Sequence, residues 1–145
     1  WKFVIFHKKD ALQWVNALNC LSVGNQNWAM DTSLLICVCA NKKFKHNGNE
    51  NKWSQYDTGA ASENICLQST YLGLAAHQMG GFDSDKIRNL ANIPVEFDVM
   101  SFIAVGKPLA KKLMTNEQAE AEGSARKRLK LNEIYFENKW DNFEG

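Results

Sequence analysis

The sequence lacks a strong net charge, because 17 basic and 16 acidic residues leave a formal charge of +1. A nearly neutral domain has no electrostatic reason to bind nucleic acid or a membrane surface as a whole. The apolar run between residues 57 and 83 is interrupted too often by polar side chains for a bilayer span. No signal peptide, transit peptide or lipid anchor is visible. We therefore expect neither a nucleic-acid nor a membrane partner.

Cysteine is also scarce, with Cys20, Cys37, Cys39 and Cys66 as the four positions. So few cysteines do not make a disulfide framework, which favours a reducing compartment and predicts a cytoplasmic protein. Cys37 and Cys39 would share one face of a strand, but two cysteines with one residue between them are not a usual zinc knuckle. The three histidines are scattered. We expect buried, reduced thiols and no metal site.

The motifs of side-chain catalysis are missing as well. No nucleophile elbow surrounds any serine, and the sequence contains no HExxH pair. Asp57, Glu63 and Asp83 are better explained as helix caps or solvated residues than as general acids. His77 is better explained as a structural histidine than as a ligand. We therefore expect no catalytic side chain.

The most informative segment that is present covers residues 57–83. Its apolar residues point in all directions around a helix, which predicts a long core helix that begins after Asp57 and runs directly into Gly80 and Gly81. A Gly-Gly turn lets the backbone approach a bulky group, because no Cβ intervenes. Its N–H groups could bind an anion or the polar edge of a planar cofactor. A simple glycine C-cap is the competing interpretation.

Weaker patterns predict the remaining elements. We expect strands at 1–7, 34–40 and 99–106, helices at 10–18 and 84–90, a turn at 20–27, a mobile surface loop at 41–53 and a short terminal strand or arm at 134–136. Asp10 is the expected N-cap of the first helix, and Ser84 or Asp83 that of the second. Strands separated by helices indicate one α/β or α+β domain over residues 1–145. The apolar residues near the C-terminus, including Trp140 and Phe143, need a surface to pack on, and a partner subunit is one candidate.

A basic run from Arg126 to Lys130 is the second candidate site. In an extended segment Arg126 and Arg128 point to the same side, where two guanidinium forks would clamp a phosphate dianion. A solvated charge run and a nucleic-acid or nuclear-localisation patch are the competing interpretations. The low net charge and the lack of interleaved aromatic residues argue against a nucleic-acid groove.

Taken in order, several short motifs resemble those of the nitroreductase family of FMN-dependent oxidoreductases. They are WKFVI at 1–5, GNQNWA at 24–29, YDTGA at 56–60, NICLQ at 64–68, GL at 73–74, HQMGGFD at 77–83, RKRL at 126–129, EIYF at 133–136 and Trp140. Each motif is weak by itself, but the ordered set spans nearly the whole chain.

The resemblance implies an α+β fold in which helices pack on a mainly antiparallel sheet, and an intertwined homodimer with FMN at the subunit interface. The N–H groups at the Gly-Gly turn would meet the N5 and O4 edge of the flavin. Gln78 and Met79 would lie beside the ring, and Arg126 and Arg128 would hold the phosphate. The implied cofactor-binding residues are Gln78, Met79, Gly80, Gly81, Arg126 and Arg128. The C-terminal arms around residues 134–140 would be exchanged between the subunits.

The chemistry implied by the resemblance resides on the flavin. NAD(P)H would deliver hydride to flavin N5, leave, and be replaced by a nitroaromatic, quinone or similar acceptor in a ping-pong sequence. The family's Arg-Arg-Ser motif and a Ser/Asn-containing stretch, which also bind FMN, would precede Trp1. Either further residues precede Trp1 or the flavin site lacks one wall. A degenerate flavin- or partner-binding member without turnover, and an interaction module that uses residues 126–130, are the alternative functions.

Overall fold

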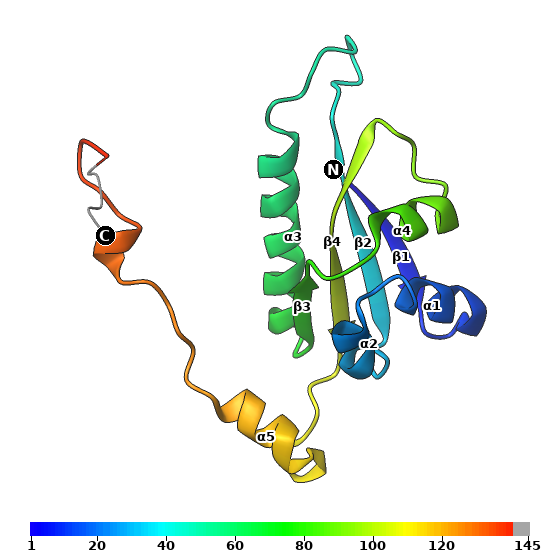
Figure 1. Cartoon of the computed structure of the whole chain (residues 1–145), viewed down its shortest axis with the longest axis vertical. Coiled ribbons are helices and arrows are strands. Elements are labelled where there is room, and N and C mark those ends of the chain that lie inside the picture. The colour runs from blue at the N-terminus through cyan, green and yellow to red at the C-terminus, as the bar shows by residue number, and fades with distance from the viewer. Residues whose placement is uncertain (141–145) are drawn as a thin grey trace. The chain divides into compact units, whose positions relative to one another are not determined.

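One four-stranded antiparallel sheet organises the larger of the two units into which the chain divides, Trp1–Pro108 and Leu109–Gly145. The computed structural model describes residues 1–140. The strands lie in the order β1-β2-β4-β3 (Figure 1), with β1 at Lys2–His7, β2 at Leu34–Asn41, β3 at Ala75–Met79 and β4 at Phe97–Gly106. The α+β fold class and the mainly antiparallel sheet predicted from the sequence are confirmed.

The central strand β2 is buried on both faces, and all residues from Leu35 to Ala40 are buried. Leu35, Cys37 and Cys39 face one apolar layer, while Ile36 and Val38 face the other. A continuous apolar run of this length is typical of a strand that is covered on both sides. The sheet is therefore the middle layer of a three-layer arrangement.

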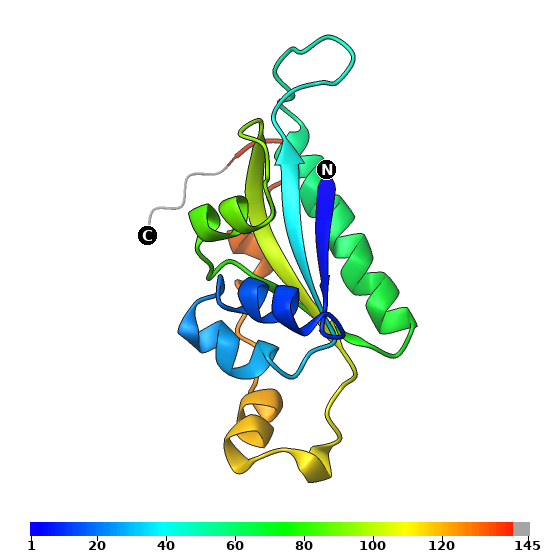
Figure 2. The same cartoon turned by 90° about the vertical axis from the view of Figure 1, so that its right-hand side faces the viewer.

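Helices cover both faces of the sheet (Figure 2). Three of them pack on one face, namely α1 (Ala11–Leu18), α2 (Val23–Ala29) and α4 (Ser84–Leu90), and α3 (Ser54–Tyr71) packs on the other. Trp14 of α1 and Ile87 of α4 join the core beneath Phe102 of β4. Ile65 of α3 packs against Ile36 and Val38 on the opposite face.

The predicted boundaries of the long helix are wrong at both ends. The helix α3 begins at Ser54 with Trp53 at its N-cap, so Asp57 lies in the first turn, and it ends at Tyr71. Gly73 adopts a positive φ of 70°, which only glycine adopts readily, and this turns the chain out of the helix. Residues 75–79 then form β3, because pairing with β4 outweighs their helical pattern.

The prediction that this helix is buried all round is also wrong. Its buried side chains are small and polar, namely Ser54, Thr58, Ser62 and Ser69. The hydroxyl groups of Thr58, Ser62 and Ser69 each donate a hydrogen bond of 2.6–2.8 Å to the carbonyl four residues earlier, so no buried hydroxyl lacks a partner. These short side chains let the helix lie close to the sheet. Large apolar residues such as Leu67 instead remain exposed.

The segment predicted as a turn around Gly24 forms the helix α2 instead. Ser22 at its N-cap makes no side-chain capping bond, and the helix is only seven residues long. Tertiary contacts supply what local sequence lacks, since Ala29 is fully buried and Gln26 Nε2 donates to the carbonyl of Leu21 at 2.7 Å. Short helices depend on such packing rather than on intrinsic propensity.

The predicted N-caps of α1 and α4 and the predicted third strand are confirmed, the strand with a small shift in boundary. Asp10 caps α1 by accepting from the backbone of Gln13, and Asp83 caps α4. The strand predicted at 99–106 begins two residues earlier, at Phe97. The segment predicted as a loop at 41–53 lies outside helices and strands from residue 42 onward, except for an isolated bridge between Lys43 and Glu50, while Asn41 ends β2. Among residues 1–140, no helix is long and apolar enough to cross a membrane.

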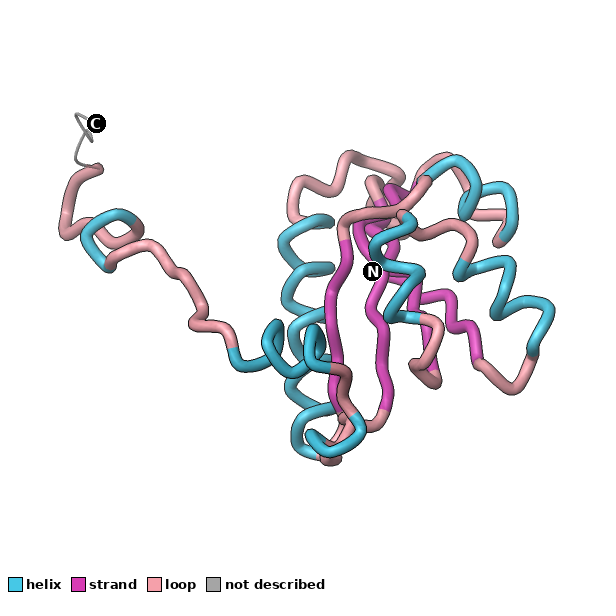
Figure 3. Tube along the Cα trace, turned by 60° about the horizontal axis from the view of Figure 1, so that its bottom comes forward, coloured by secondary structure: helices cyan, strands magenta, loops and turns pink. Residues whose placement is uncertain are grey.

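The second unit contains short helical segments joined by extended chain, as the tube in Figure 3 shows. They are η1 (Lys111–Leu113), α5 (Asn116–Gly123) and η2 (Leu131–Glu133). A capping box between Thr115 and Gln118 starts α5. Residues 134–136 do not form the strand that was one of the two predictions for them. Phe143, predicted to end the arm, lies outside the described residues.

Candidate functional site

The Gly80–Gly81 turn joins β3 to α4, so it follows a strand and not a helix. The alternative interpretation of these glycines as a helix C-cap is therefore wrong. The last β3–β4 pair joins Met79 to Phe102, and the chain leaves the sheet at Gly80. The turn thus begins at a fixed point beside the core, because Met79 and Phe102 are both buried.

Backbone hydrogen bonds hold the turn against the connection between α1 and α2. An isolated antiparallel bridge pairs Leu21 with Phe82. Two bonds flank this bridge, from the N–H of Ser22 to the carbonyl of Gly81 at 2.9 Å and from the N–H of Asp83 to the carbonyl of Cys20 at 2.7 Å. Although the turn is a loop, its backbone is therefore positioned like a strand.

The two glycines have different surroundings. A Cβ at Gly81 would lie 2.7 Å from Ser22 Oγ and 2.9 Å from Asn25 Nδ2, whereas a Cβ at Gly80 would meet no atom within 4 Å. Asn25 Nδ2 also donates to the carbonyl of Gly81 at 3.0 Å. Glycine at position 81 is required by close packing against α2. Position 80 faces open space.

The N–H groups of Gly80 and Gly81 donate no hydrogen bond to any residue of the described chain. Gly80 is exposed and Gly81 half-buried, so these N–H groups are free to bond to water or to a ligand. Two such donors next to an open position form a site for an acceptor group or for the polar edge of a flat molecule. This is the only chemistry that the turn itself can supply.

The neighbouring residues Gln78 and Met79 point in different directions. The side chain of Met79 is 2% exposed and packs in the core. Gln78 is exposed, and its Nε2 lies 3.4 Å from Glu63 Oε2 on α3. Burial raises the pKa of the Cys66 thiol and the Glu63 charge raises it further, while a hydrogen bond from Gln78 opposes both effects. Gln78 therefore links the turn to α3.

Arg126 and Arg128 lie in the second unit, whereas Gly80 lies in the first. Both side chains are exposed, and Arg128 Nη1 donates to the carbonyl of Lys127 at 3.0 Å. The chain between Ser124 and Lys130 forms no helix or strand, and both of these residues are extended. The phosphate clamp inferred for the two arginines stays a prediction.

Two polar residues near the turn have structural contacts. His77 is exposed on β3, and its ring lies edge-on to that of Trp28 with centroids 5.0 Å apart. Asp83 accepts from the backbone N–H groups of Lys86 and Asp85, and the bond from Lys86 is the main reason that its pKa lies below the usual value. Neither arrangement positions an acid or base toward Gly80.

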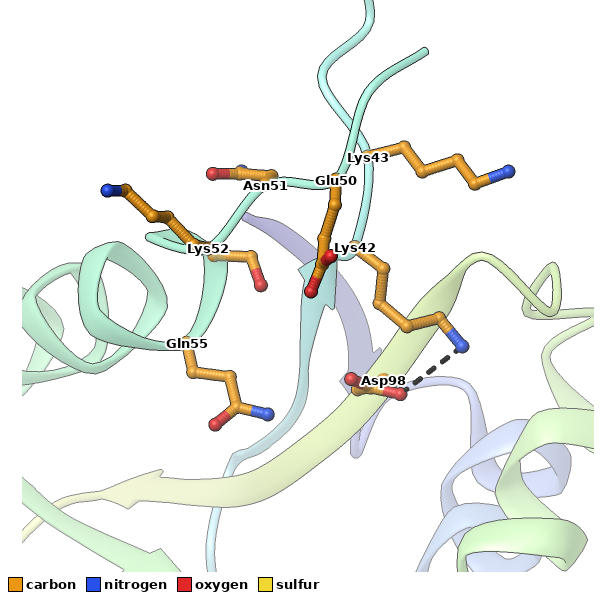
Figure 4. Close-up of a pocket in the computed structure, with 8 residues that line it drawn as sticks. Lys42, Lys43, Glu50, Asn51, Lys52, Gln55 and Asp98 are labelled. Atoms are coloured by element: carbon orange, nitrogen blue, oxygen red, sulfur yellow. Dashed lines mark ion pairs between the residues drawn. The ribbon is translucent and has the colours of Figure 1, made fainter.

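Sequence reasoning missed a charged recess of about 500 Å³ at the far end of β2 (Figure 4). Lys42 Nζ lies 3.5 Å from Asp98 Oδ1 there, while Lys43 and Lys52 point away from each other into solvent. The signal was the lysine-rich segment at 41–53. Exposed ion pairs contribute little energy, and the opposite charges nearly cancel, so the recess favours no particular ligand.

Among residues 1–140, no cluster of three or more His, Cys, Asp or Glu could hold a metal ion.

We predict that Gly81→Ala lowers the free energy of unfolding by about 1 kcal/mol, because the new Cβ displaces Asn25 from its hydrogen bond to the Gly81 carbonyl. Gly80→Ala is the matched control and should leave stability nearly unchanged. Urea denaturation followed by circular dichroism measures both variants. Equal stability of the two variants would contradict the packing role of position 81.

Comparison with known proteins gives a consistent family. The model of the nitroreductase family matches residues 1–107. A protein of Mycolicibacterium smegmatis, described as an uncharacterized 15.4 kDa protein in the ask 5' region, is 32% identical over 127 residues, which cover 84% of this chain and 80% of that protein.

Solved structures extend the match to the fold. The structure of an oxidoreductase containing FMN superposes with a TM-score of 0.85 and 31% identity, covering 97% of this chain and 72% of that one. A nitroreductase family protein from Clostridium difficile 630 superposes with a TM-score of 0.66 at 21% identity, covering 96% and 74%, and supports the fold alone. With a family match over residues 1–107 and a relative above 30% identity, the chain belongs to the nitroreductase family.

Proposed function

We propose that this protein is an FMN-dependent oxidoreductase that passes hydride from NAD(P)H to nitroaromatic, quinone or similar flat acceptors. Membership of the nitroreductase family supports this proposal. So does the 31% identity, over 97% of the chain, to a solved oxidoreductase that contains FMN. When bound, FMN supplies the redox chemistry, because a flavin accepts hydride from a nicotinamide and returns the electrons to a second substrate.

The observation that carries the proposal is the open, rigid backbone at Gly80. A flavin presents acceptor atoms along its N5 and O4 edge, and the N–H groups of Gly80 and Gly81 are donors without a partner in the described chain. A flat ring needs close access to those donors, and no atom stands within 4 Å of the missing Cβ at Gly80. The residues present therefore fit a flavin edge.

The other proposed cofactor contacts differ in kind. Met79 would contribute through its backbone and through the packing beneath the turn, because its side chain is buried in the core. Gln78 would lie beside the ring, held by its contact with Glu63. Arg126 and Arg128 would bind the phosphate, since a pair of guanidinium groups suits a dianion. N–H donors at the ring edge would favour the reduced, more negative flavin.

A second copy of the chain is the proposed partner. The outward side of α3 exposes Tyr56, Leu67 and Tyr71, and the second unit exposes Tyr135 and Trp140. Large apolar side chains gathered on one helix are typical of an interface. We propose that the copies associate through α3 and exchange the segments around 134–140. The four unpaired cysteines support the cytoplasmic location that the sequence predicts.

The first test is the visible absorption spectrum of the purified full chain. We expect bound flavin, or reconstitution by added FMN, and bleaching when NADPH or NADH is added without oxygen. The donor that bleaches the flavin faster is the preferred one. Flavin that binds but is reduced by neither nucleotide would favour the degenerate member without turnover. A protein that does not take up FMN would refute the proposal.

Gly80→Val should abolish FMN binding, because a branched side chain would fill the open space beside Gly80 in which the flat ring is proposed to lie. The fold should be retained, since no protein atom lies near the new Cβ. FMN fluorescence quenching measures binding, and circular dichroism confirms folding. A folded Gly80→Val protein that binds FMN at normal stoichiometry would place the ring elsewhere.

Substitution of Arg126 and Arg128 by glutamine should weaken FMN binding while leaving riboflavin binding unchanged, because riboflavin lacks the phosphate. Lys127→Gln is the matched control in the same exposed segment. Titration of each protein with FMN and with riboflavin separates the phosphate contact from the ring contact. Unchanged FMN affinity in the double variant would show that the two arginines do not bind the phosphate. If the double variant instead bound FMN normally but lost binding to a protein partner, the chain would be an interaction module that uses residues 126–130.

A further inference from the structure

Two buried cysteines lie next to each other in the middle strand of the sheet. The Sγ atoms of Cys37 and Cys39 are 3.9 Å apart, and both residues are at most 2% exposed. They face the apolar layer beneath α1 and α4, and the proposed flavin chemistry uses neither of them. Two thiols in contact have a chemistry that a single buried cysteine lacks, because one can resolve an oxidised form of the other.

A small pocket gives access to this pair. It measures about 130 Å³ and lies between β1 and the chain that joins α4 to β4, with Val4, Cys39, Pro94 and Phe97 in its lining. Liquid water occupies roughly 30 Å³ per molecule, so the pocket has room for roughly four molecules of that size. Hydrogen peroxide fits, whereas a bulky oxidant does not. Cys37 does not line this pocket, so Cys39 is the first thiol that a small oxidant meets.

The surroundings favour ionisation of Cys39 over Cys37. A hydrogen bond from Cys37 lowers the pKa of the Cys39 thiol, burial opposes this, and the positive charge of Arg88 lowers it further. The same hydrogen bond and burial raise the pKa of Cys37. The Arg88 guanidinium is held in place by the carbonyls of Ile93, Pro94 and Phe97 at 2.8–3.1 Å. A fixed cation near a thiol is the usual environment of a reactive cysteine.

We propose that Cys37 and Cys39 form a peroxide-sensitive thiol pair in which Cys39 is attacked first and Cys37 resolves it. The Cys39 sulfur attacks one peroxide oxygen, the O–O bond breaks, and the leaving hydroxide becomes water, which leaves a sulfenic acid. The Cys37 sulfur then attacks the Cys39 sulfur, an S–S bond forms, the S–O bond breaks, and a second water leaves. Two thiols lose two electrons in total, and hydrogen peroxide gains them.

The strand geometry makes this disulfide possible and easily reversed. Alternate Cα atoms on a strand are roughly 6.6 Å apart, near the upper end of the range that disulfides span. The pairing of β2 with β4 is irregular between Val38 and Cys39, and such an irregularity bends the strand at this point. A disulfide at the limit of its range is reduced readily, as reversible regulatory disulfides are.

The test uses the full chain and hydrogen peroxide as the probe. After oxidation the protein is denatured, alkylated with iodoacetamide and digested with chymotrypsin, which cleaves after Trp28 and so separates Cys20 from the pair. We expect the peptide with Cys37 and Cys39 to lose two hydrogen masses and take up no alkyl group, and dithiothreitol to restore both thiols. A pair that remains fully alkylated after peroxide has oxidised Cys20 or Cys66 would overturn the proposal.

Variants assign the order of events. Cys37→Ala should leave a sulfenic acid on Cys39 that dimedone traps when the oxidised protein is unfolded in its presence, and Cys39→Ala should abolish both the adduct and the disulfide. Cys20→Ala is the matched control, because it removes a buried thiol outside the pair and should still form the disulfide. Thermal melts establish that each variant is folded. Dimedone adducts on Cys37 instead of Cys39 would reverse the assigned roles. The peroxide experiment on the wild-type protein does not depend on whether the protein binds flavin, so its failure and the failure of the proposed function are distinguishable.

Discussion

The arrangement depends on one constraint, which is that β2 is covered on both faces. Because every residue from Leu35 to Ala40 is buried, the strand needs a layer of helices on each side and a strand along each edge. The side with α1, α2 and α4 places the α1–α2 connection where it can bond to the turn after β3. The position of Gly80 is therefore a consequence of how β2 is buried.

The two faces are covered in different ways. One face is filled by large side chains such as Trp14 and Phe102, which interdigitate in an apolar core. On the other face, hydroxyl-bearing side chains of α3 allow close approach, and their hydrogen bonds to the helix's own carbonyls remove the cost of burying them. Because the short hydroxyl-bearing residues of α3 face the sheet, its larger apolar residues face outward, where we propose that a second copy of the chain covers them.

The sequence predicted the family, the fold class and the elements that carry strong local signals. Asp10 and Asp83 were identifiable as caps because a carboxylate just before a helical pattern accepts hydrogen bonds from the N–H groups of the first turn. Residues 75–79 were assigned to a helix because their apolar run has no period of its own, and only the pairing with β4 makes them a strand.

For the site, the sequence predicted that the Gly-Gly pair lets the backbone approach another group closely. The different surroundings of Gly80 and Gly81 were not predictable, because the crowding comes from Asn25, more than fifty residues away in sequence. Arg126 and Arg128 lie in a different unit from the turn, and no local sequence pattern relates them to it.

The bridge between Leu21 and Phe82 has a consequence for motion. Because Ser22 and Asp83 each donate a backbone bond across it, one segment cannot swing away unless the other loses its partner. The turn after β3 and the start of α2 therefore belong to a single opening unit, and their amide protons should exchange with solvent at a common rate. A flat molecule that rests on Gly80 would therefore also slow exchange at the start of α2, through this shared bridge.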